Sequence, residues 1–205
     1  MARETSFGNQ KMSDVSVVPL TIWAEGKSDN EISDFLCSFS CEDINKDVHR
    51  FFRKKSLAFA RSNISATHLV LSSDFNNILA FYTLVCKPLS VNADGLTEEN
   101  QNSLELFCRL NKSTNCYAFS AYLIAQLGLN YAPGLNGSLN GDELMALILD
   151  HLRRIRINLG GNLTFVEYET GNKKLFDYYT RNGFVSLQST SDSDDKLDQL
   201  FCFID

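Results

Sequence analysis

The sequence predicts a mixed α/β fold of the α+β class: a central, mostly antiparallel twisted sheet of about six to seven strands with helices on both faces. Two β-rich runs, Thr67–Ser72 and Ile78–Cys86, flank a short turn-like segment, which is typical of an antiparallel hairpin. Further on, an amphipathic helix over Gly141–Asn158 separates two apolar β-rich runs, Tyr117–Leu129 and Asn162–Tyr168. Hairpins followed by such a β-α-β unit indicate a mixed sheet.

Size and composition fit one soluble globular domain. The chain has 205 residues, of which 44% are hydrophobic and 21% are charged, enough to bury a core without disulfides or metals. We expect a disordered tail over residues 1–14, which are polar and aperiodic, and a single domain over residues 15–205. No apolar run approaches the roughly 20 residues of a membrane span, and the N-terminus has no apolar signal region, so we predict a cytoplasmic protein with no membrane partner.

The first half contains one strand and two helices before the hairpin. Val15–Trp23 alternates weakly and predicts a strand, and Asn30–Phe35 predicts a short helix. Asp43–Arg61 predicts one long helix with apolar residues on one side and most of its cations on the other. The cationic side is either a solvated surface or a docking surface for a polyanion, and both interpretations stay open. The cations are Lys46, Arg50, Arg53, Lys54, Lys55 and Arg61.

Beyond the hairpin, Lys87–Asn102 is predicted to be a polar insertion and Ser103–Leu110 a short helix. Near the C-terminus, Phe184–Leu187 and Leu200–Ile204 predict two closing strands, joined by an acidic, serine-rich connection.

Charge and residue spacing exclude several kinds of site. The six cysteines include no C-x-x-C pair, and the three histidines have no ligand spacing, so we predict free thiols and no metal. The net charge of −6 opposes a global attraction to nucleic acid, although the uneven charge leaves a local basic face open.

The loop before the Gly141 helix is rich in glycine and asparagine, but it matches no common phosphate motif. No G-K-[ST] follows Gly134, and the chain has neither a nucleophile elbow nor a dinucleotide fingerprint. Asn140 and Glu143 have the spacing of a capping box. This loop is therefore either a phosphate site at a helix N-terminus or simply a well-capped helix start. The carboxylates of Asp142 and Glu143 would compete with a bound anion, so backbone N–H groups of Asn136–Leu139 would have to do most of the binding.

The segment Asn172–Phe184 reads N-K-K-L-F-D-Y-Y-T-R-N-G-F. With the strand, loop and helix before it, the segment resembles the second half of the GNAT N-acetyltransferases, whose corresponding motif is N-x-x-A-x-x-F-Y-x-x-x-G-F. In the loop, Gly137 and Gly141 fit the family pattern, whereas Leu139 stands where a glycine is usual.

The N-terminal half resembles the GNAT toxin branch of toxin–antitoxin systems. It has Phe39-Ser40-Cys41, a cationic helix, a T-H-L-V-L strand and A-F-Y-T-L, with Ala80 where that branch usually has glycine. The resemblance implies acetyl transfer from acetyl-CoA to a primary amine, the α-amine of an aminoacyl-tRNA in that branch. It also implies an antitoxin partner and leaves a homodimer open.

The resemblance further implies residue roles. Tyr179 would protonate the leaving thiolate, and Tyr178 is expected to be a core aromatic. Asn172 would either contact the cofactor arm or cap its helix. Glu167 and Glu169 are expected to point to solvent, which leaves no general base and favours an α-amine acceptor. The expected acetyl-CoA-binding residues are Leu127, Gly128, Leu129, Asn136, Gly137, Ser138, Leu139, Asn140, Gly141 and Asn172.

Two alternatives stay open beside the toxin-like enzyme. One is a GNAT enzyme for a small amine or a protein N-terminus, and the other is a degenerate GNAT fold that acts as a binding module. The tRNA interpretation predicts that a set of cations lines one entrance beside Tyr179. This set is Arg50, Arg53, Lys54, Arg153, Arg154, Arg156, Lys173 and Lys174.

Overall fold

The computed structural model describes residues 15–190 and 197–204. The expected tail over residues 1–14 lies outside this part. The described residues form two compact units that are interleaved in the sequence: residues 15–83 and 126–146 make the first, and residues 84–125, 147–190 and 197–204 make the second. The single domain over residues 15–205 stays a prediction.

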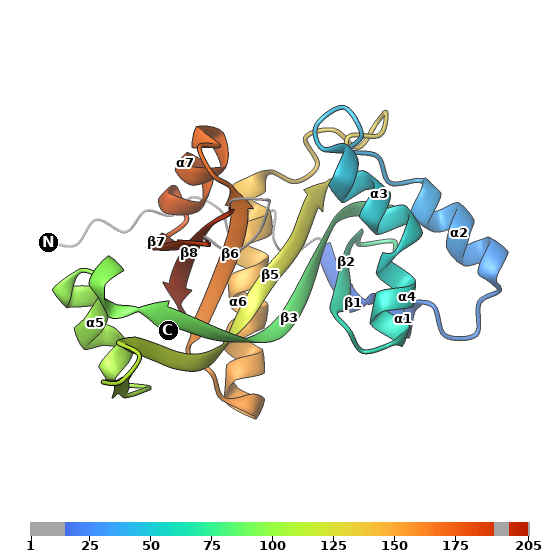
Figure 1. Cartoon of the computed structure of the whole chain (residues 1–205). Coiled ribbons are helices and arrows are strands. Elements are labelled where there is room, and N and C mark those ends of the chain that lie inside the picture. The colour runs from blue at the N-terminus through green and yellow to red at the C-terminus, as the bar shows by residue number, and fades with distance from the viewer. Residues whose placement is uncertain (1–14, 191–196, 205) are drawn as a thin grey trace, which may run out of the picture. The chain divides into compact units, whose positions relative to one another are not determined.

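The described strands form one mixed sheet of eight strands in the order β1-β2-β3-β5-β6-β8-β7, with β4 paired to β5 beside this path (Figure 1). The pair β5/β6 is parallel, whereas β1/β2, β4/β5, β6/β8 and β7/β8 are antiparallel. A mixed, mostly antiparallel sheet is therefore confirmed, with one strand more than expected. The strands are β1 Val15–Pro19, β2 Ala66–Ser72, β3 Ile78–Asn92, β4 Leu110–Asn111, β5 Cys116–Leu129, β6 Leu163–Glu169, β7 Val185–Thr190 and β8 Leu197–Phe203.

Seven α-helices and one short 3-10 turn accompany these strands in the described part of the chain. They are α1 Leu20–Trp23, α2 Asp29–Cys37, α3 Lys46–Lys54, α4 Ser56–Arg61, η2 Ala93–Gly95, α5 Glu98–Glu105, α6 Gly141–Leu159 and α7 Lys173–Arg181.

In the first unit, two predicted boundaries are wrong. The first strand ends at Pro19, not Trp23, because Pro19 is the N-cap of α1 and cannot donate a hydrogen bond to extend the ladder. The predicted long helix over Asp43–Arg61 is two helices, α3 and α4. Its backbone leaves the helical region at Lys55, where φ is −121° and ψ is −27°.

The core of the first unit lies between α1–α4 and the strands β2 and β3. Its centre is a group of three aromatic rings, in which Phe52 stacks on Phe81 at 4.2 Å and tilts against Phe39 at 4.7 Å between ring centroids. Gly128 of β5 lies against this group. A Cβ atom at Gly128 would be only 3.1 Å from Phe81 and Val48 and 3.3 Å from Phe39, so this glycine is needed for packing.

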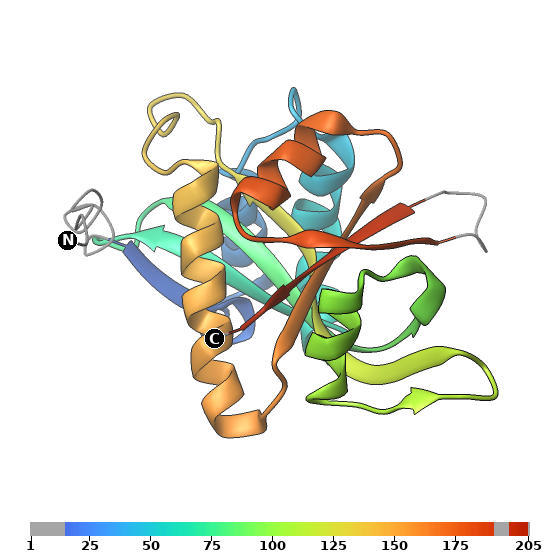
Figure 2. The same ribbon diagram turned by 90° about the vertical axis from the view of Figure 1, so that its left-hand side faces the viewer.

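In the second unit, β6, β8 and β7 are neighbours, with α7 beside them (Figure 2). Phe165 of β6 is opposite Phe201 of β8, and both belong to a core that also contains Leu104 of α5. Tyr168 lies three positions further along β6 and therefore faces the other way, because side chains alternate along a strand. There Tyr168 packs against Tyr179 of α7, at 6.0 Å between ring centroids.

The segment before β4 differs from the prediction. The polar insertion over Lys87–Asn102 is in part the end of β3, because its alternate residues Leu89 and Val91 are buried. The helix predicted over Ser103–Leu110 is misplaced. The helix here is α5, which begins earlier because Thr97 caps it by accepting a hydrogen bond from the N–H of Asn100, and it ends at Glu105, whereas Leu110 belongs to β4.

None of the helices in the described ranges has both the length and the apolar composition needed to cross a bilayer. The described residues also contain no group of three or more His, Cys, Asp or Glu side chains that could hold a metal ion.

Candidate functional site

The predicted site residues fall in both units. Leu127–Leu129 and the loop through Gly141 lie in the first unit, whereas Asn172 and Tyr179 lie in the second.

In the first unit, Asn130 anchors the start of the loop. Its side chain is 3% exposed. The Oδ1 atom accepts hydrogen bonds from the N–H groups of Ser40 at 3.0 Å and Ala132 at 2.9 Å, and Nδ2 donates to the carbonyls of Ile78 at 2.7 Å and Ser38 at 3.4 Å. This one amide ties the end of β5 to the start of β3 and to the segment before α3. The sequence prediction missed Asn130, because its partners are far away in the chain.

The loop itself is partly open. Gly134 and Gly137 have φ values of 84° and 83°. A Cβ atom at either glycine would meet nothing within 4 Å, so a phosphate group could approach the backbone at these positions. Leu139 and Leu144, by contrast, are both buried. These residues occupy the N′ and N4 positions of α6, where an apolar pair fixes the entry of the chain into a helix. Leu139 therefore serves the fold where the family usually has a glycine.

The capping box of α6 is confirmed. The N–H of Asn140 donates to the Glu143 carboxylate at 2.8 Å, and the N–H of Glu143 donates to Asn140 Oδ1 at 2.9 Å. A phosphate at this helix end would have to compete with the Glu143 carboxylate for one N–H group and for the positive end of the helix.

The cations of α3 divide into two groups. Lys46, Arg50 and Lys54 are exposed and four residues apart, so they follow one face of the helix. Arg53 is half-buried, and its Nη1 lies 3.1 Å from Nε2 of the buried His49. Arg53 therefore belongs to the interior of this unit and is a poor candidate for the predicted cationic entrance.

Cys41 begins the segment that leads to α3, and its thiol is buried. Burial raises the pKa of Cys41 to about 11. A thiol whose pKa is raised by folding contributes stability below its unfolded pKa, and this contribution disappears as the pH rises through the folded value.

We therefore expect the free energy of unfolding to fall by about 1–3 kcal/mol through the Cys41 thiol alone between about pH 9 and about pH 11. Urea unfolding of the wild type and of Cys41→Ala at several pH values in this window measures it. The wild type should lose stability more steeply than the variant. Parallel slopes would show that the Cys41 thiol is not the responsible group.

In the second unit, the roles expected for the two tyrosines are reversed with respect to burial. Tyr179, not Tyr178, is the core aromatic: it is 6% exposed and packs against Tyr168 and Phe184. Tyr178 is half-buried beneath the guanidinium of Arg181. Burial raises the pKa of Tyr179 to about 12. The Tyr179 phenol is therefore protonated at neutral pH and can donate a hydrogen bond.

Asn172 caps its helix, which is one of the two roles expected for it. Its Oδ1 accepts a hydrogen bond from the N–H of Leu175 at 3.2 Å, so Asn172 caps α7. Lys173 and Lys174 follow in the first turn of this helix and are exposed. Arg156, which was predicted to line the same entrance, is half-buried and donates to the carbonyl of Ile204.

Glu167 does not simply point to solvent, which corrects the expectation. Its side chain is 24% exposed. Its Oε1 accepts a hydrogen bond at 2.8 Å from Nε2 of Gln199, which lies directly opposite on β8, and Lys87 of β3 is 3.9 Å from its Oε2. The sequence predicts the wrong surroundings for this carboxylate because the register of β6 with β8 is not visible in it. Glu169, by contrast, is exposed as expected.

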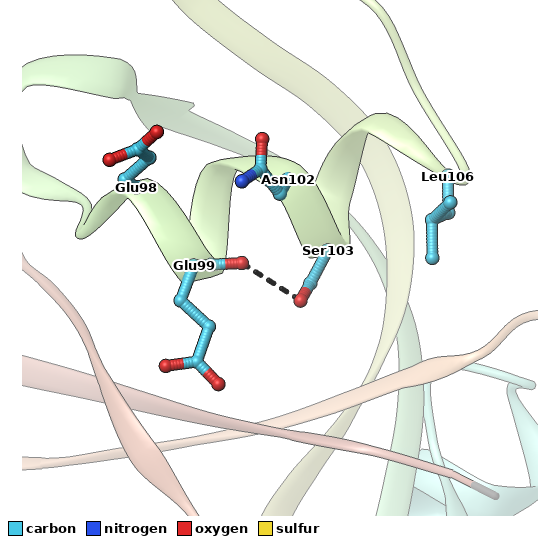
Figure 3. A pocket seen from close by; sticks show the side chains of 5 residues that line it. All are labelled: Glu98, Glu99, Asn102, Ser103 and Leu106. Atoms are coloured by element: carbon cyan, nitrogen blue, oxygen red, sulfur yellow. Dashed lines mark hydrogen bonds between the residues drawn. The ribbon is translucent and has the colours of Figure 1, made fainter.

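A shallow hollow lies on the outer face of α5 (Figure 3). Its lining includes two carboxylates, so it would repel an anionic cofactor, and Ser103 in it already donates to the carbonyl of Glu99. We assign no part of the site to it. The lining residues are Glu98, Glu99, Asn102, Ser103 and Leu106.

The order of elements is that of the GNAT acetyltransferases: a strand, a glycine-containing loop, a long helix, a parallel strand and a short tyrosine-bearing helix. Solved structures bear this out, and the chain has a GNAT toxin-like fold. No protein-family model and no curated protein sequence matches the chain.

Three of the similar structures illustrate the likeness. A tyrosine-to-phenylalanine variant of the toxin AtaT, bound to the C-terminus of the antitoxin AtaR and acetyl-CoA, is 18% identical, with 93% of this chain and 94% of that chain covered and a TM-score of 0.60. A tyrosine-to-phenylalanine variant of KacT is 16% identical, with coverages of 93% and 95% and a TM-score of 0.62. AtaT complexed with acetyl-methionyl-tRNAfMet is 17% identical, with coverages of 90% and 94% and a TM-score of 0.61.

Proposed function

We propose that the protein is an acetyl-CoA-dependent N-acetyltransferase whose acceptor is the α-amine of an aminoacyl-tRNA. The observation that carries this proposal is the likeness of nearly the whole chain to AtaT, which was solved with acetyl-CoA and with acetyl-methionyl-tRNAfMet. By the same likeness, we propose an antitoxin as a protein partner. A homodimer stays open.

The loop before α6 suits the pyrophosphate of acetyl-CoA because two of its glycines have free space beside them. Gly134 and Gly137 would let a pyrophosphate approach the backbone, and the N-terminus of α6 would add the helix dipole. The proposed contacts are those of the backbone from Asn136 to Gly141. Strand-like hydrogen bonds from Leu127 to Leu129 would hold the pantetheine arm.

Tyr179 is the proposed acid. Its phenol would donate a hydrogen bond to the leaving sulfur and so stabilise the negative charge that forms there. Its high pKa makes it a weak acid, so proton transfer would accompany the loss of a proton from the amine.

The exposed cations of α3 support a polyanionic acceptor. Lys46, Arg50 and Lys54 present three positive charges on one helix face, as phosphate-backbone contacts require. Binding of tRNA through them should weaken steeply with salt.

A second candidate is a binding module without transferase activity. It is favoured by the Glu143 carboxylate, which occupies the helix end where the pyrophosphate would bind. The proposed enzyme and this module can be distinguished by their affinity for acetyl-CoA and by acetyl transfer.

The test is a translating lysate with radiolabelled acetyl-CoA, run with and without the purified protein. We expect label in the tRNA fraction that mild alkali releases as acetylated amino acid. Label in small amines or protein N-termini instead would show that the acceptor is a different amine, whereas the proposed N-acetyltransferase activity would stand. No transfer, and no heat in calorimetry with millimolar acetyl-CoA, would leave only the binding module.

A further inference from the structure

Gln126 of β5 carries a polar atom that the fold does not use. Among the residues that the structure describes, its Oε1 atom is buried and accepts no hydrogen bond. A buried carbonyl oxygen without a donor costs free energy, and an apolar side chain of the same shape avoids that cost. A methionine would fill nearly the same space, so the packing of the first unit does not explain a glutamine at this position.

The hydroxyl groups on the neighbouring strands are bonded to each other instead. Phe81 of β3 lies against Gly128 of β5, so two residues further along these antiparallel strands Thr83 lies across from Gln126. The Thr83 hydroxyl forms a hydrogen bond of 3.0 Å with the hydroxyl of Thr67 on β2, and both threonines are buried. Thr83 is therefore held by β2, not by Gln126.

The side chain of Gln126 lies on the face of the sheet that α3 covers (Figure 1). Side chains alternate along a strand, so Gln126 points to the same side as the Cβ position of Gly128. That position faces Phe39 and, on α3, Val48. The exposed cations that we propose as tRNA contacts belong to the same helix. Gln126 and these cations are therefore on one side of β5.

Gln126 also lies at one end of the segment that we propose for the pantetheine arm. All four residues from Gln126 to Leu129 are partly exposed, whereas the preceding residues Ala121–Ile124 are buried. The pyrophosphate would bind beyond Leu129, in the loop before α6, so the thiol end of the cofactor would extend back along β5 toward Gln126. An amine that attacks the thioester there would come within reach of this amide.

We propose that Gln126 contacts the acceptor and selects primary amines. The inference rests on the proposed function. Oε1 has no hydrogen bond to give up, and the last torsion of a glutamine side chain turns easily, so the amide can present Oε1 to one N–H of the amine. The nitrogen lone pair is then free to face the thioester carbon.

A primary amine has two N–H hydrogens, and acetyl transfer removes only one of them. As the N–C bond forms and the C–S bond breaks, one proton leaves the nitrogen for solvent and the sulfur gains one from the acid. The other hydrogen stays in the product amide, so its bond to Gln126 persists through the reaction. The amine of prolyl-tRNA has a single N–H and must lose the hydrogen that Gln126 holds. Gln126 therefore favours primary α-amines over prolyl-tRNA.

The test compares Gln126→Met with Ser65→Ala as the matched control. Ser65 Oγ is likewise buried without a hydrogen-bond partner in the described part of the chain, but Ser65 precedes β2 and is outside the proposed site. Each change removes an unpaired polar atom, so the melting temperature of both variants should equal or exceed that of the wild type. Gln126→Glu is a second variant, which keeps an accepting oxygen on a side chain of the same length.

With labelled acetyl-CoA and bulk aminoacyl-tRNA as the probe, we expect Gln126→Met to lower kcat/KM by about 10- to 100-fold and Ser65→Ala to stay within about threefold of the wild type. Gln126→Glu should retain more activity than Gln126→Met. The amino acids that mild alkali releases give the selectivity: the wild type should prefer primary amines to prolyl-tRNA by about tenfold or more, and Gln126→Met should narrow this preference to about threefold. Acetyl-CoA affinity by calorimetry should not change.

An active wild type with an equally active Gln126→Met would overturn this inference and leave the proposed function standing. A lower melting temperature together with weaker acetyl-CoA binding in Gln126→Met would also overturn it, because Gln126 would then serve the fold. An unchanged preference against prolyl-tRNA in Gln126→Met would contradict the selectivity assigned to this residue. A wild type with no transfer to tRNA would contradict the proposed function and this inference together.

Discussion

Replacing Asn130 by alanine should lower the free energy of unfolding by about 3–5 kcal/mol, because the change leaves one buried and three part-buried backbone groups without this partner. The Asn130 side chain makes four hydrogen bonds, and it is 3% exposed. Water cannot easily replace the bond to the carbonyl of Ile78, because that bond is buried. Urea unfolding at neutral pH measures the loss.

Asn140→Ala is the matched control. Asn140 is also an asparagine that bonds to backbone, but it is exposed and caps a single helix, so its loss should cost only about 1 kcal/mol. If the two variants were equally stable, Asn130 would not anchor the loop. Because Asn130 holds the first residues of the proposed cofactor loop, we also expect its replacement to weaken acetyl-CoA binding.

Replacing Tyr179 by phenylalanine should lower kcat by about 100-fold or more, because it removes the proposed acid and little else. The aromatic ring, which packs against Tyr168 and Phe184, is retained. The melting temperature and the affinity for acetyl-CoA should therefore stay close to those of the wild type. Initial rates with saturating aminoacyl-tRNA and labelled acetyl-CoA give the comparison.

Tyr178→Phe supplies the control for this change. Tyr178 is the adjacent residue on α7, it is half-buried, and Arg181 covers its ring. We expect the kcat of Tyr178→Phe to stay within about threefold of the wild-type value. A large loss in Tyr178→Phe with full activity in Tyr179→Phe would transfer the acid role to Tyr178. Full activity in both variants would remove the phenols of α7 from the mechanism.

Features that depend on neighbours in sequence could be predicted well. The capping box between Asn140 and Glu143 needs only two residues three apart and a following apolar run, and it is present. The N-cap at Asn172 and the bounds of α6 and α7 follow from similarly local patterns. The element order behind the GNAT-like prediction is the sum of such local patterns, which is why the fold class was predictable.

Features that depend on partners far away in the sequence could not be predicted. Helical periodicity continues through Lys55, and only the structure shows that α3 ends there. Tyr178 and Tyr179 are adjacent, and which one is buried depends on how α7 lies against Tyr168 of β6. The same holds for Leu139, whose burial at the start of α6 explains a departure from the family's glycine.

The sequence by itself determined the class of fold and the segment Asn172–Phe184, because short-range periodicity, caps and turns are properties of a few neighbouring residues. Only the tertiary structure decided what Asn130, Gly128 and Glu167 do. An asparagine becomes an anchor and a glycine a packing position only when distant strands and loops meet around them. Glu167 faces Gln199 because β6 and β8 pair in one particular register, and a shift by one residue would turn its side chain to the other face.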